Sequence, residues 1–137
     1  MKIKLLFIDD DESFLMYAKQ SCKKIDLVSD ILIAHDGVEG LDVIQSCLNK
    51  KTLPKIIFVD VNMPKMNGFE FLIEFNKLKS IYPELENIYP IAMLTSSGDV
   101  KDQEKANQLG VFRYLIKGNT LAEFRNAIME CINVTNV

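Results

Sequence analysis

Five short apolar runs alternate along this chain with longer stretches in which apolar residues recur every three or four positions. The runs are IKLLFI (3–8), DILIA (30–34), KIIFV (55–59), YPIAML (89–94) and FRYLI (112–116). They are rich in Ile, Leu, Val and Phe without strict alternation, which is typical of strands covered on both faces. Five strand–helix repeats predict an α/β domain with a doubly wound parallel sheet and helices on both faces.

The five helical stretches differ in how many apolar residues they offer to the sheet. The last has a continuous apolar stripe behind a cap at Asn119 or Thr120; the stripe consists of Leu121, Phe124, Ile128, Cys131 and Ile132. The fourth, DVKDQEKANQLG (99–110), has few apolar anchors, namely Val100, Ala106 and Leu109, with Gly110 as its stop. A helix that buries so little is expected to be held only marginally. In the first helix, Asp11 and Glu12 are expected to do no more than cap its start.

Length, composition and charge narrow the class of protein. A chain of 137 residues suits one domain, 1–137, and 48% apolar residues are ordinary for a soluble globular protein. The net charge of -3 gives no general attraction to nucleic acid or to anionic membranes. No run is long enough for a membrane span, and the start is not a signal peptide. Cys22, Cys47 and Cys131 are expected to be reduced core cysteines of a cytoplasmic protein.

Two loops stand out between these elements. NKKTLPK (49–55) and SIYPELENIYP (80–90) are rich in turn-forming residues and are expected to be exposed. The only histidine, His35, lies in the loop after the second run, where a surface position is a better expectation than a phosphorelay role.

Reactive side chains gather where the predicted strands end. Asp9 and Asp10 follow the first run, Asp60 closes the third, Thr95 the fourth and Lys117 the fifth. Singly, each has an ordinary structural explanation, such as a helix cap or a solvated lysine. In a doubly wound sheet, however, the carboxyl ends of the strands meet at one rim, which is where ligands bind. The joint occurrence on four strands therefore predicts a functional site.

The chemistry of this set suits phosphoryl transfer. Asp9, Asp10 and Asp60 form a hard oxygen site for Mg²⁺, which would offset the repulsion between neighbouring carboxylates. With such a cation present, Asp60 could attack a phosphoryl group and form an aspartyl phosphate. The ammonium of Lys117 and the hydroxyl of Thr95 could then neutralise the remaining phosphoryl oxygens.

The motifs FIDDDESFL, VDVNMPKMNGFEFL, MLTSSGD and YLIKG follow one another on the expected strands. Together they resemble the receiver domain of bacterial two-component response regulators, of the stand-alone, chemotaxis-regulator type, and the resemblance covers essentially the whole chain. It implies a flavodoxin-like fold with five parallel strands in the order 2-1-3-4-5 and five helices. It also implies a sensor histidine kinase or phosphotransfer protein as phosphoryl donor, and a downstream protein target.

The resemblance implies a role for each residue of the rim. Asp60 would accept the phosphoryl group, and Asp10 would bind Mg²⁺, for which Mn²⁺ could substitute. Asp9 would assist the metal through water, and Asn62 would contribute its backbone carbonyl. Lys117 would contact the phosphoryl group.

It further implies a switch and a shaped loop. Thr95 would move toward the phosphoryl group and Tyr114 would turn with it, while Pro64 and Gly68 would shape the loop behind Asp60 through their dihedral preferences. One departure concerns Gly118, because the family usually has a proline there, often after a cis bond. A non-proline cis bond costs about 3 kcal/mol, so we expect a trans bond and a less rigid Lys117.

The signal would leave through the fourth-helix face to a protein partner, because no DNA-binding stretch or second catalytic set follows in the sequence. Dimerisation through that face is left open, and so is a tuning role for Asn62 and Ser97. Two alternatives compete with this hypothesis. One is a Mg²⁺-dependent phosphohydrolase with an aspartate nucleophile, disfavoured because its general acid position here holds Asn62. The other is a pseudo-receiver that keeps the fold without using phosphate.

Overall fold

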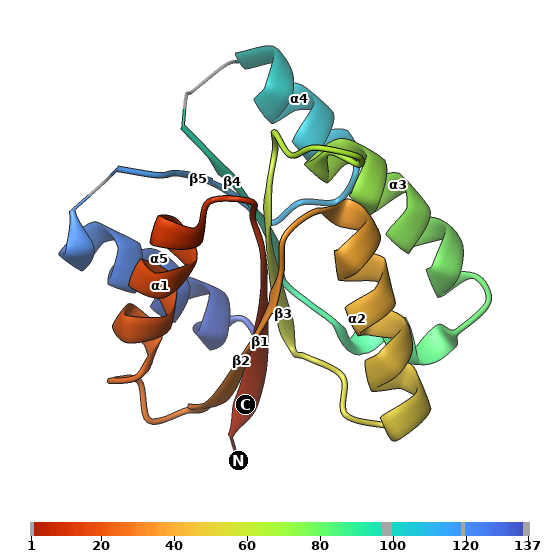
Figure 1. Ribbon diagram of the computed structural model, residues 1–137, viewed down its shortest axis with the longest axis horizontal. Helices are drawn as coiled ribbons and strands as arrows, with labels where there is room; N and C mark the ends of the chain where they lie inside the picture. Colours follow the sequence, from red (N-terminus) through yellow and green to blue (C-terminus); the bar gives the residue numbers. More distant parts are fainter. Residues whose placement is uncertain (1, 97–99, 119, 136–137) are drawn as a thin grey trace.

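The computed structural model describes residues 2–96, 100–118 and 120–135. In these ranges, strands and helices alternate as the apolar pattern predicts, with one additional 3-10 helix (Figure 1). The strands are β1 (Ile3–Ile8), β2 (Val28–Ala34), β3 (Ile56–Asp60), β4 (Ile91–Thr95) and β5 (Arg113–Ile116). The helices are α1 (Glu12–Cys22), α2 (Gly37–Lys50), α3 (Gly68–Lys79), η1 (Pro83–Asn87), α4 (Val100–Gln108) and α5 (Leu121–Asn133).

All strand pairs are parallel, and the strand order is β2-β1-β3-β4-β5. The predicted fold class and strand order are thereby confirmed. Figure 1 shows α1 and α5 on one face of the sheet and α2 and α3 on the other, with α4 above the end of β4. Successive strand side chains point to opposite faces, so Leu6 and Ile8 pack toward α2 and α3, whereas Leu5 and Phe7 pack toward α1 and α5.

Several element bounds differ from the sequence prediction. β2 begins at Val28 rather than at residue 30, because Val28 already pairs with Ile3 although the neighbouring Ser29 and Asp30 are polar edge residues. β4 begins at Ile91, after the cis bond between Tyr89 and Pro90.

The expectation that the loop 80–90 is exposed is wrong in its central part. The helix η1 lies within it, and Leu85 and Ile88 are buried against the same core cluster as α3. In the loop 49–55, Pro54 is likewise buried. The apolar residues within these turn-rich loops therefore pack into the core, although the residues around them form turns.

The helix starts follow from short polar side chains that satisfy free backbone N–H groups. Asp11 caps α1, Asp36 caps α2, Asn67 forms a capping box with Glu70 at α3, and Thr120 caps α5. Of the two caps predicted for the last helix, Thr120 is thus confirmed, whereas Asn119 lies outside the described residues.

Two of the three anchors predicted for the fourth helix can be placed. Ala106 is fully buried and Leu109 is half-buried, while the side chain of Val100 lies outside the described residues. Gly110 follows at a φ of 83°, a left-handed conformation that suits a glycine stop. By contrast, α5 buries Phe124, Ala127, Ile128, Cys131 and Ile132.

The three cysteines lie in the core, as the sequence predicts. Cys22, Cys47 and Cys131 are free thiols buried in the core. Within the described ranges, no helix combines the length and the apolar character that crossing a bilayer would require.

Candidate functional site

Strand register brings the predicted residues of the rim together. Ile8 pairs with Val59, so the next residues, Asp9 and Asp60, lie side by side at the ends of β1 and β3. Thr95 pairs with Ile116 at the other side of β3, which places Lys117 directly beyond the pair. The parallel sheet thus positions side chains that are far apart in the sequence.

Three carboxylates meet at this rim. Asp9, Asp10 and Asp60 each offer an oxygen, and these oxygens all lie within 4.8 Å of one another. Asp9 is fully buried and Asp60 is 6% exposed, whereas Asp10 faces solvent. Asp9 is held in place by the backbone N–H of Asp11, which donates to Oδ1 at 2.9 Å.

The ammonium of Lys117 lies against the two buried acids. Its Nζ is 2.6 Å from Oδ2 of Asp9 and 3.5 Å from Oδ2 of Asp60. The backbone N–H of Lys117 donates to the carbonyl of Thr95 at 2.6 Å, which ties the start of this loop to β4. Lys117 is therefore anchored at its backbone and paired at its tip.

Burial makes these acids hard to ionise. Burial, together with the charge of Asp9, raises the pKa of Asp60 to about 7, although Lys117 works in the opposite direction. Burial also raises the pKa of Asp9, against the lowering effect of Lys117. Burial alone would lower the pKa of Lys117, but the two carboxylates raise it overall, so the ammonium stays charged.

One lysine cannot balance three acids, and the remaining charge suits a small divalent cation. Mg²⁺ and Mn²⁺ prefer carboxylate, carbonyl and water oxygens, and the donor set of Asp9, Asp10 and Asp60 is of that kind. Because Asp10 is exposed, the cluster is open to solvent on one side, so a hydrated ion could enter. The residues present therefore fit such an ion.

Comparison with known proteins decides the family. Residues 5–129 match the response regulator receiver domain. The chain belongs to the response regulator receiver family. It is 31% identical over 115 residues to a chemotaxis protein CheY homolog of Campylobacter jejuni, and the match covers 84% of this chain and 81% of that protein. Receiver domains act in two-component signalling.

Other relatives are longer than this receiver domain. The match to the probable transcriptional regulator ycf27 of Guillardia theta has 27% identity and covers 98% of this chain but only 47% of that protein. The chain thus spans about half the length of the ycf27 relatives it matches.

Solved structures confirm the fold of the receiver domain. The phosphorylated cyanobacterial phytochrome response regulator RcpA superposes with a TM-score of 0.78 at 22% identity, over 95% of this chain and 91% of that one. The Mn²⁺-bound form of response regulator Rcp1 superposes with a TM-score of 0.74 at 24% identity, over 93% of this chain and 90% of that one. As a family, receiver domains bind Mg²⁺ or Mn²⁺ in an acidic pocket.

The other residues for which the sequence predicts a role in this receiver domain lie as follows. Thr95 is buried at the end of β4, and Tyr114 is half-buried in β5, where it packs against the core cluster beneath α2 and α3. Asn62 lies two residues beyond Asp60 and is exposed. Ser97 lies outside the described residues.

The loop behind Asp60 corrects one prediction. Gly68 is required there by close approach rather than by dihedral freedom, because a Cβ on it would overlap the carbonyl oxygen of Asp60. The left-handed residue of the loop is Lys65, at a φ of 65°. The carbonyl of Val61 accepts a hydrogen bond from the N–H of Gly68, so α3 begins directly against the end of β3.

Gly118 has a conformation that proline cannot adopt. Its φ is 90°, whereas the proline ring holds φ near −65°. Within the described residues the cis bond precedes Pro90, so the bond from Lys117 to Gly118 is trans, as predicted.

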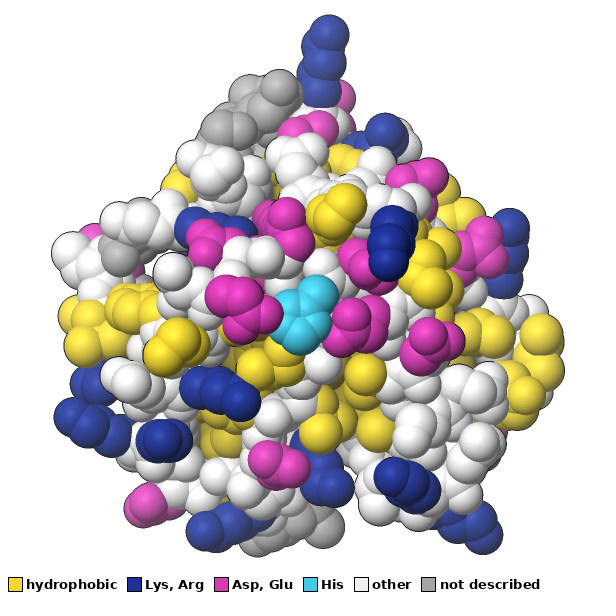
Figure 2. Space-filling view, viewed as in Figure 1, with side chains coloured by type: hydrophobic (Ala, Val, Ile, Leu, Met, Phe, Trp, Pro, Cys, Tyr) yellow, Lys and Arg dark blue, Asp and Glu magenta, His cyan; other side chains and the backbone are white. Residues whose placement is uncertain are grey.

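The sequence did not reveal one charged contact near the rim. His35 lies between two glutamates, with Nε2 2.5 Å from Glu12 and Nδ1 2.8 Å from Glu39. Figure 2 shows the histidine side chain with acidic side chains on either side of it. The hydrogen bond and charge of Glu39, and then Glu12, raise the pKa of His35. The surface position predicted for His35 is confirmed by its 43% exposed side chain.

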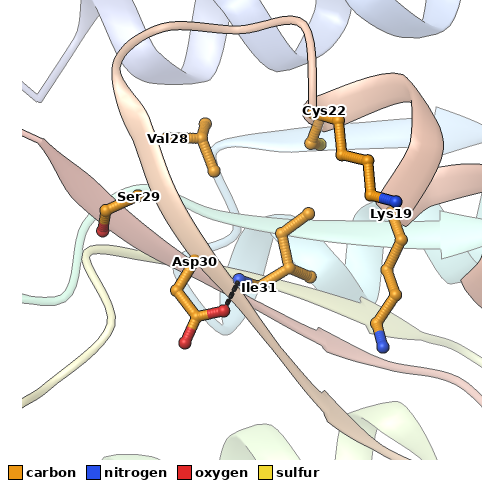
Figure 3. Close-up of a pocket in the computed structure, with 7 residues that line it drawn as sticks. Lys19, Cys22, Val28, Ser29, Asp30 and Ile31 are labelled. Carbon is orange, nitrogen blue, oxygen red and sulfur yellow. Dashed lines mark hydrogen bonds between the residues drawn. The ribbon is translucent and has the colours of Figure 1, made fainter.

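A hollow at the opposite end of the sheet is no rival site. It lies between the end of α1 and the start of the edge strand β2 (Figure 3), and Lys19, Cys22 and Asp30 are among its lining. The carboxylate of Asp30 accepts from the N–H of Ile31 and so covers part of the strand edge. Burial raises the pKa of the Cys22 thiol to about 12, which keeps it protonated and unreactive.

Proposed function

We propose that this chain is a single receiver domain, 1–137, that accepts a phosphoryl group on Asp60 and passes the signal to a protein partner. The observation that carries the proposal is the position of Asp60. It ends β3 within 4.8 Å of the oxygens of Asp9 and Asp10, and its Oδ2 lies 3.5 Å from the ammonium of Lys117. A nucleophile, a cation site and a positive side chain are thus within reach of one another.

In the reaction we propose, a carboxylate oxygen of Asp60 attacks phosphorus while the bond from phosphorus to the donor breaks. With phosphohistidine of a sensor kinase or phosphotransfer protein as donor, the electron pair of that N–P bond returns to the imidazole, which is then protonated. Asp60 must be ionised to attack, so lowering its pKa from about 7 favours the step.

The neighbouring residues would each supply charge stabilisation. Asp10 and Asp9, with the backbone carbonyl of Asn62, would hold Mg²⁺ or Mn²⁺, which supplies neutralisation of the phosphoryl oxygens when bound. Lys117 would contact a second oxygen of the group. Thr95 would contact a third through its hydroxyl.

The signalling step would use the weakest part of the fold. In our proposal Thr95 moves toward the phosphoryl group, Tyr114 turns into the space left, and α4 shifts on the sheet. Among the described side chains of α4, Ala106 is the one that is fully buried, so we infer that only a small apolar surface holds this helix. A bias of a few kcal/mol would then change the populations of two arrangements. The α4–β5–α5 face would carry the signal to the partner, in the cytoplasm, with homodimerisation left open.

The test is phosphorylation by a small donor. Native protein is incubated with acetyl phosphate and Mg²⁺ and its intact mass is measured, with Asp60→Asn as the matched control and Asp10→Asn as a metal-site variant. We expect one phosphoryl increment in the native chain, none in Asp60→Asn, and a slower gain in Asp10→Asn. If the native chain gains no phosphoryl group, the pseudo-receiver is the better description. Continued hydrolysis of a phosphomonoester would instead indicate a phosphohydrolase.

A second measurement tests the switch separately. Amide hydrogen exchange is compared with and without beryllofluoride, which mimics the phosphoryl group. We expect altered exchange in α4 and unchanged exchange in α2, which lies on the same face but is bound by a broader apolar stripe. Identical exchange in α4 would contradict the switch while leaving the phosphorylation result intact.

A further inference from the structure

The side chain of Lys117 has a neighbour that the proposed reaction does not use. Its Nζ lies over the ring of Phe14, 4.8 Å from the ring centroid. Phe14 is in the first turns of α1, and its ring is in turn held edge-to-face by Phe124 of α5, with the centroids 5.6 Å apart. The ring therefore reaches Lys117 from the α1–α5 face of the sheet.

The backbone beyond Lys117 does little to fix its side chain. Gly118 has a φ of 90°, and a Cβ on it would meet no atom within 4 Å. A lysine side chain is a compact charge on a flexible four-carbon stem, so its tip has to be placed by what surrounds it. Glycine next to it adds freedom of the chain.

The space on this side of Lys117 is also open. A cavity of about 380 Å³ is lined by Phe14, Tyr17, Lys117 and Gly118 together with other residues of α1, β5 and α5. Without the ring of Phe14, the ammonium would have room to swing toward this cavity and away from Asp60. Phe14 and Lys117 thus both line this open space, and the ring lies against the ammonium.

The acids that hold the ammonium are the same ones that would hold a cation. Oδ2 of Asp9 pairs with Lys117 and Oδ1 accepts from the N–H of Asp11, so both oxygens already have partners. If Asp9 turns its Oδ2 to a cation, Lys117 loses its 2.6 Å partner. The longer contact to Asp60 and the ring of Phe14 then remain to keep it over the reacting carboxylate.

We infer that Phe14 is a positioning residue: its aromatic face holds the ammonium of Lys117 at the phosphoryl site, through a cation–π contact. This inference rests on the proposed phosphorylation of Asp60. Phe14 itself touches no reacting atom, and it acts through Lys117. The contact needs an aromatic face, so its chemistry separates it from ordinary packing, which any apolar side chain of similar size could supply.

The test compares four variants of the full chain. Phe14→Leu and Phe14→Met remove the ring while keeping apolar volume, and Phe14→Tyr keeps the ring. Tyr17→Leu is the matched control, because its ring belongs to the same aromatic group, 5.3 Å from that of Phe124. Circular dichroism shows which variants are folded. If Phe14→Leu does not fold, Phe14→Met is used in its place.

Two readouts are taken. The first is the rate of phosphoryl gain from acetyl phosphate with Mg²⁺. We expect it to fall about three- to thirtyfold in Phe14→Leu and Phe14→Met, and to stay within about twofold of native in Phe14→Tyr and Tyr17→Leu. The second is the NMR order parameter of the Lys117 ε-methylene in metal-free protein, assigned with Lys117→Arg. We expect it to drop only where the ring is lost.

The outcomes separate this inference from the proposed function. If native protein gains no phosphoryl group, the proposed function fails, and the order parameter in metal-free protein still decides whether Phe14 holds Lys117. An unchanged order parameter and rate in the ring-less variants would overturn the positioning role. Equal losses in Phe14→Tyr or Tyr17→Leu would overturn it as well, because they would indicate general packing.

Discussion

Replacing the proposed phosphoacceptor by its neutral isostere should make the protein more stable at alkaline pH. Asp60 is 6% exposed and its pKa is raised from 3.8 to about 7 by burial and by Asp9, so its charged form is disfavoured in the folded state. Asp60→Asn removes that charge, keeps the shape, and leaves Lys117 its shorter contact to Asp9. The variant therefore reports how much conformational free energy the site costs.

The sign and size follow from proton linkage. Between pH 3.8 and about 7 the folded chain keeps a proton on Asp60 that the unfolded chain releases, so native stability falls as pH rises through this window. At about 1.4 kcal/mol per pKa unit, the full shift amounts to about 4 kcal/mol. When Asp60 ionises, Lys117 and Asp9 respond to the new charge and offset part of this cost. We expect Asp60→Asn to be about 1–4 kcal/mol more stable than native protein at pH 8, and nearly equal to it at pH 4.

The assay is urea unfolding in EDTA at pH 4, 6 and 8, followed by far-ultraviolet circular dichroism. Asp42→Asn, which neutralises an exposed carboxylate of α2, is the control and should show no such gain with pH. Adding Mg²⁺ at pH 8 should stabilise native protein and leave Asp60→Asn less affected. A variant that is no more stable than native at pH 8, or that has the same advantage at pH 4, would show that the buried acids carry no such strain.

Four further substitutions test the surrounding structure. Gly68→Ala should lower the unfolding free energy by about 2 kcal/mol or more in urea titrations, because its methyl group would overlap the carbonyl of Asp60. Asp10→Asn should weaken Mg²⁺ binding at least about tenfold by calorimetry, with Mn²⁺ affected in the same direction. His35→Gln should lower the unfolding free energy by less than about 1 kcal/mol, and only at low pH. A raised histidine pKa gives stability that is lost as pH rises through the folded pKa. The effect is small because solvent screens these exposed ion pairs. Gly118→Pro should slow phosphoryl gain from acetyl phosphate, since proline cannot keep a φ of 90° and the start of the lysine loop must move.

The sequence predicted the fold and the rim because both depend on where strands end. β1 was predicted with the correct bounds, since its apolar run stops at Asp9. β2 was predicted too short by Val28 and Ser29, because Ser29 is a polar residue at a sheet edge and interrupts the apolar run. Pairing of that stretch with β1 overrode its low β-propensity.

Contacts between side chains of different helices and strands could not be predicted from the sequence. Nothing in the position of Phe14 along the sequence indicates that its ring lies beneath an ammonium from the far end of the chain. The glutamates around His35 come from two helices whose starts meet only in the folded sheet. The need for Gly68 comes from the approach of the Asp60 carbonyl, which only the fold brings about, whereas the sequence indicates its dihedral freedom. Strand ends can thus be predicted from local patterns, whereas these contacts depend on helix orientation.

The two helices that flank β5 differ in how much apolar surface they bury, and this difference determines which of them a charge at Asp60 could move. α5 buries five side chains, including Phe124 and Ile128, and at about 25 cal/mol per Å² a comparable loss of apolar burial would cost many kcal/mol. Among the described side chains of α4, Ala106 is buried, and Leu109 just beyond the end of the helix is half-buried, so moving these residues exposes far less apolar area. A phosphoryl group adds about two negative charges at one point, which can supply a few kcal/mol of bias through charge-assisted contacts. On these burial differences we expect such a bias to shift α4 without detaching α5, so the proposed switch predicts an exchange response confined to α4.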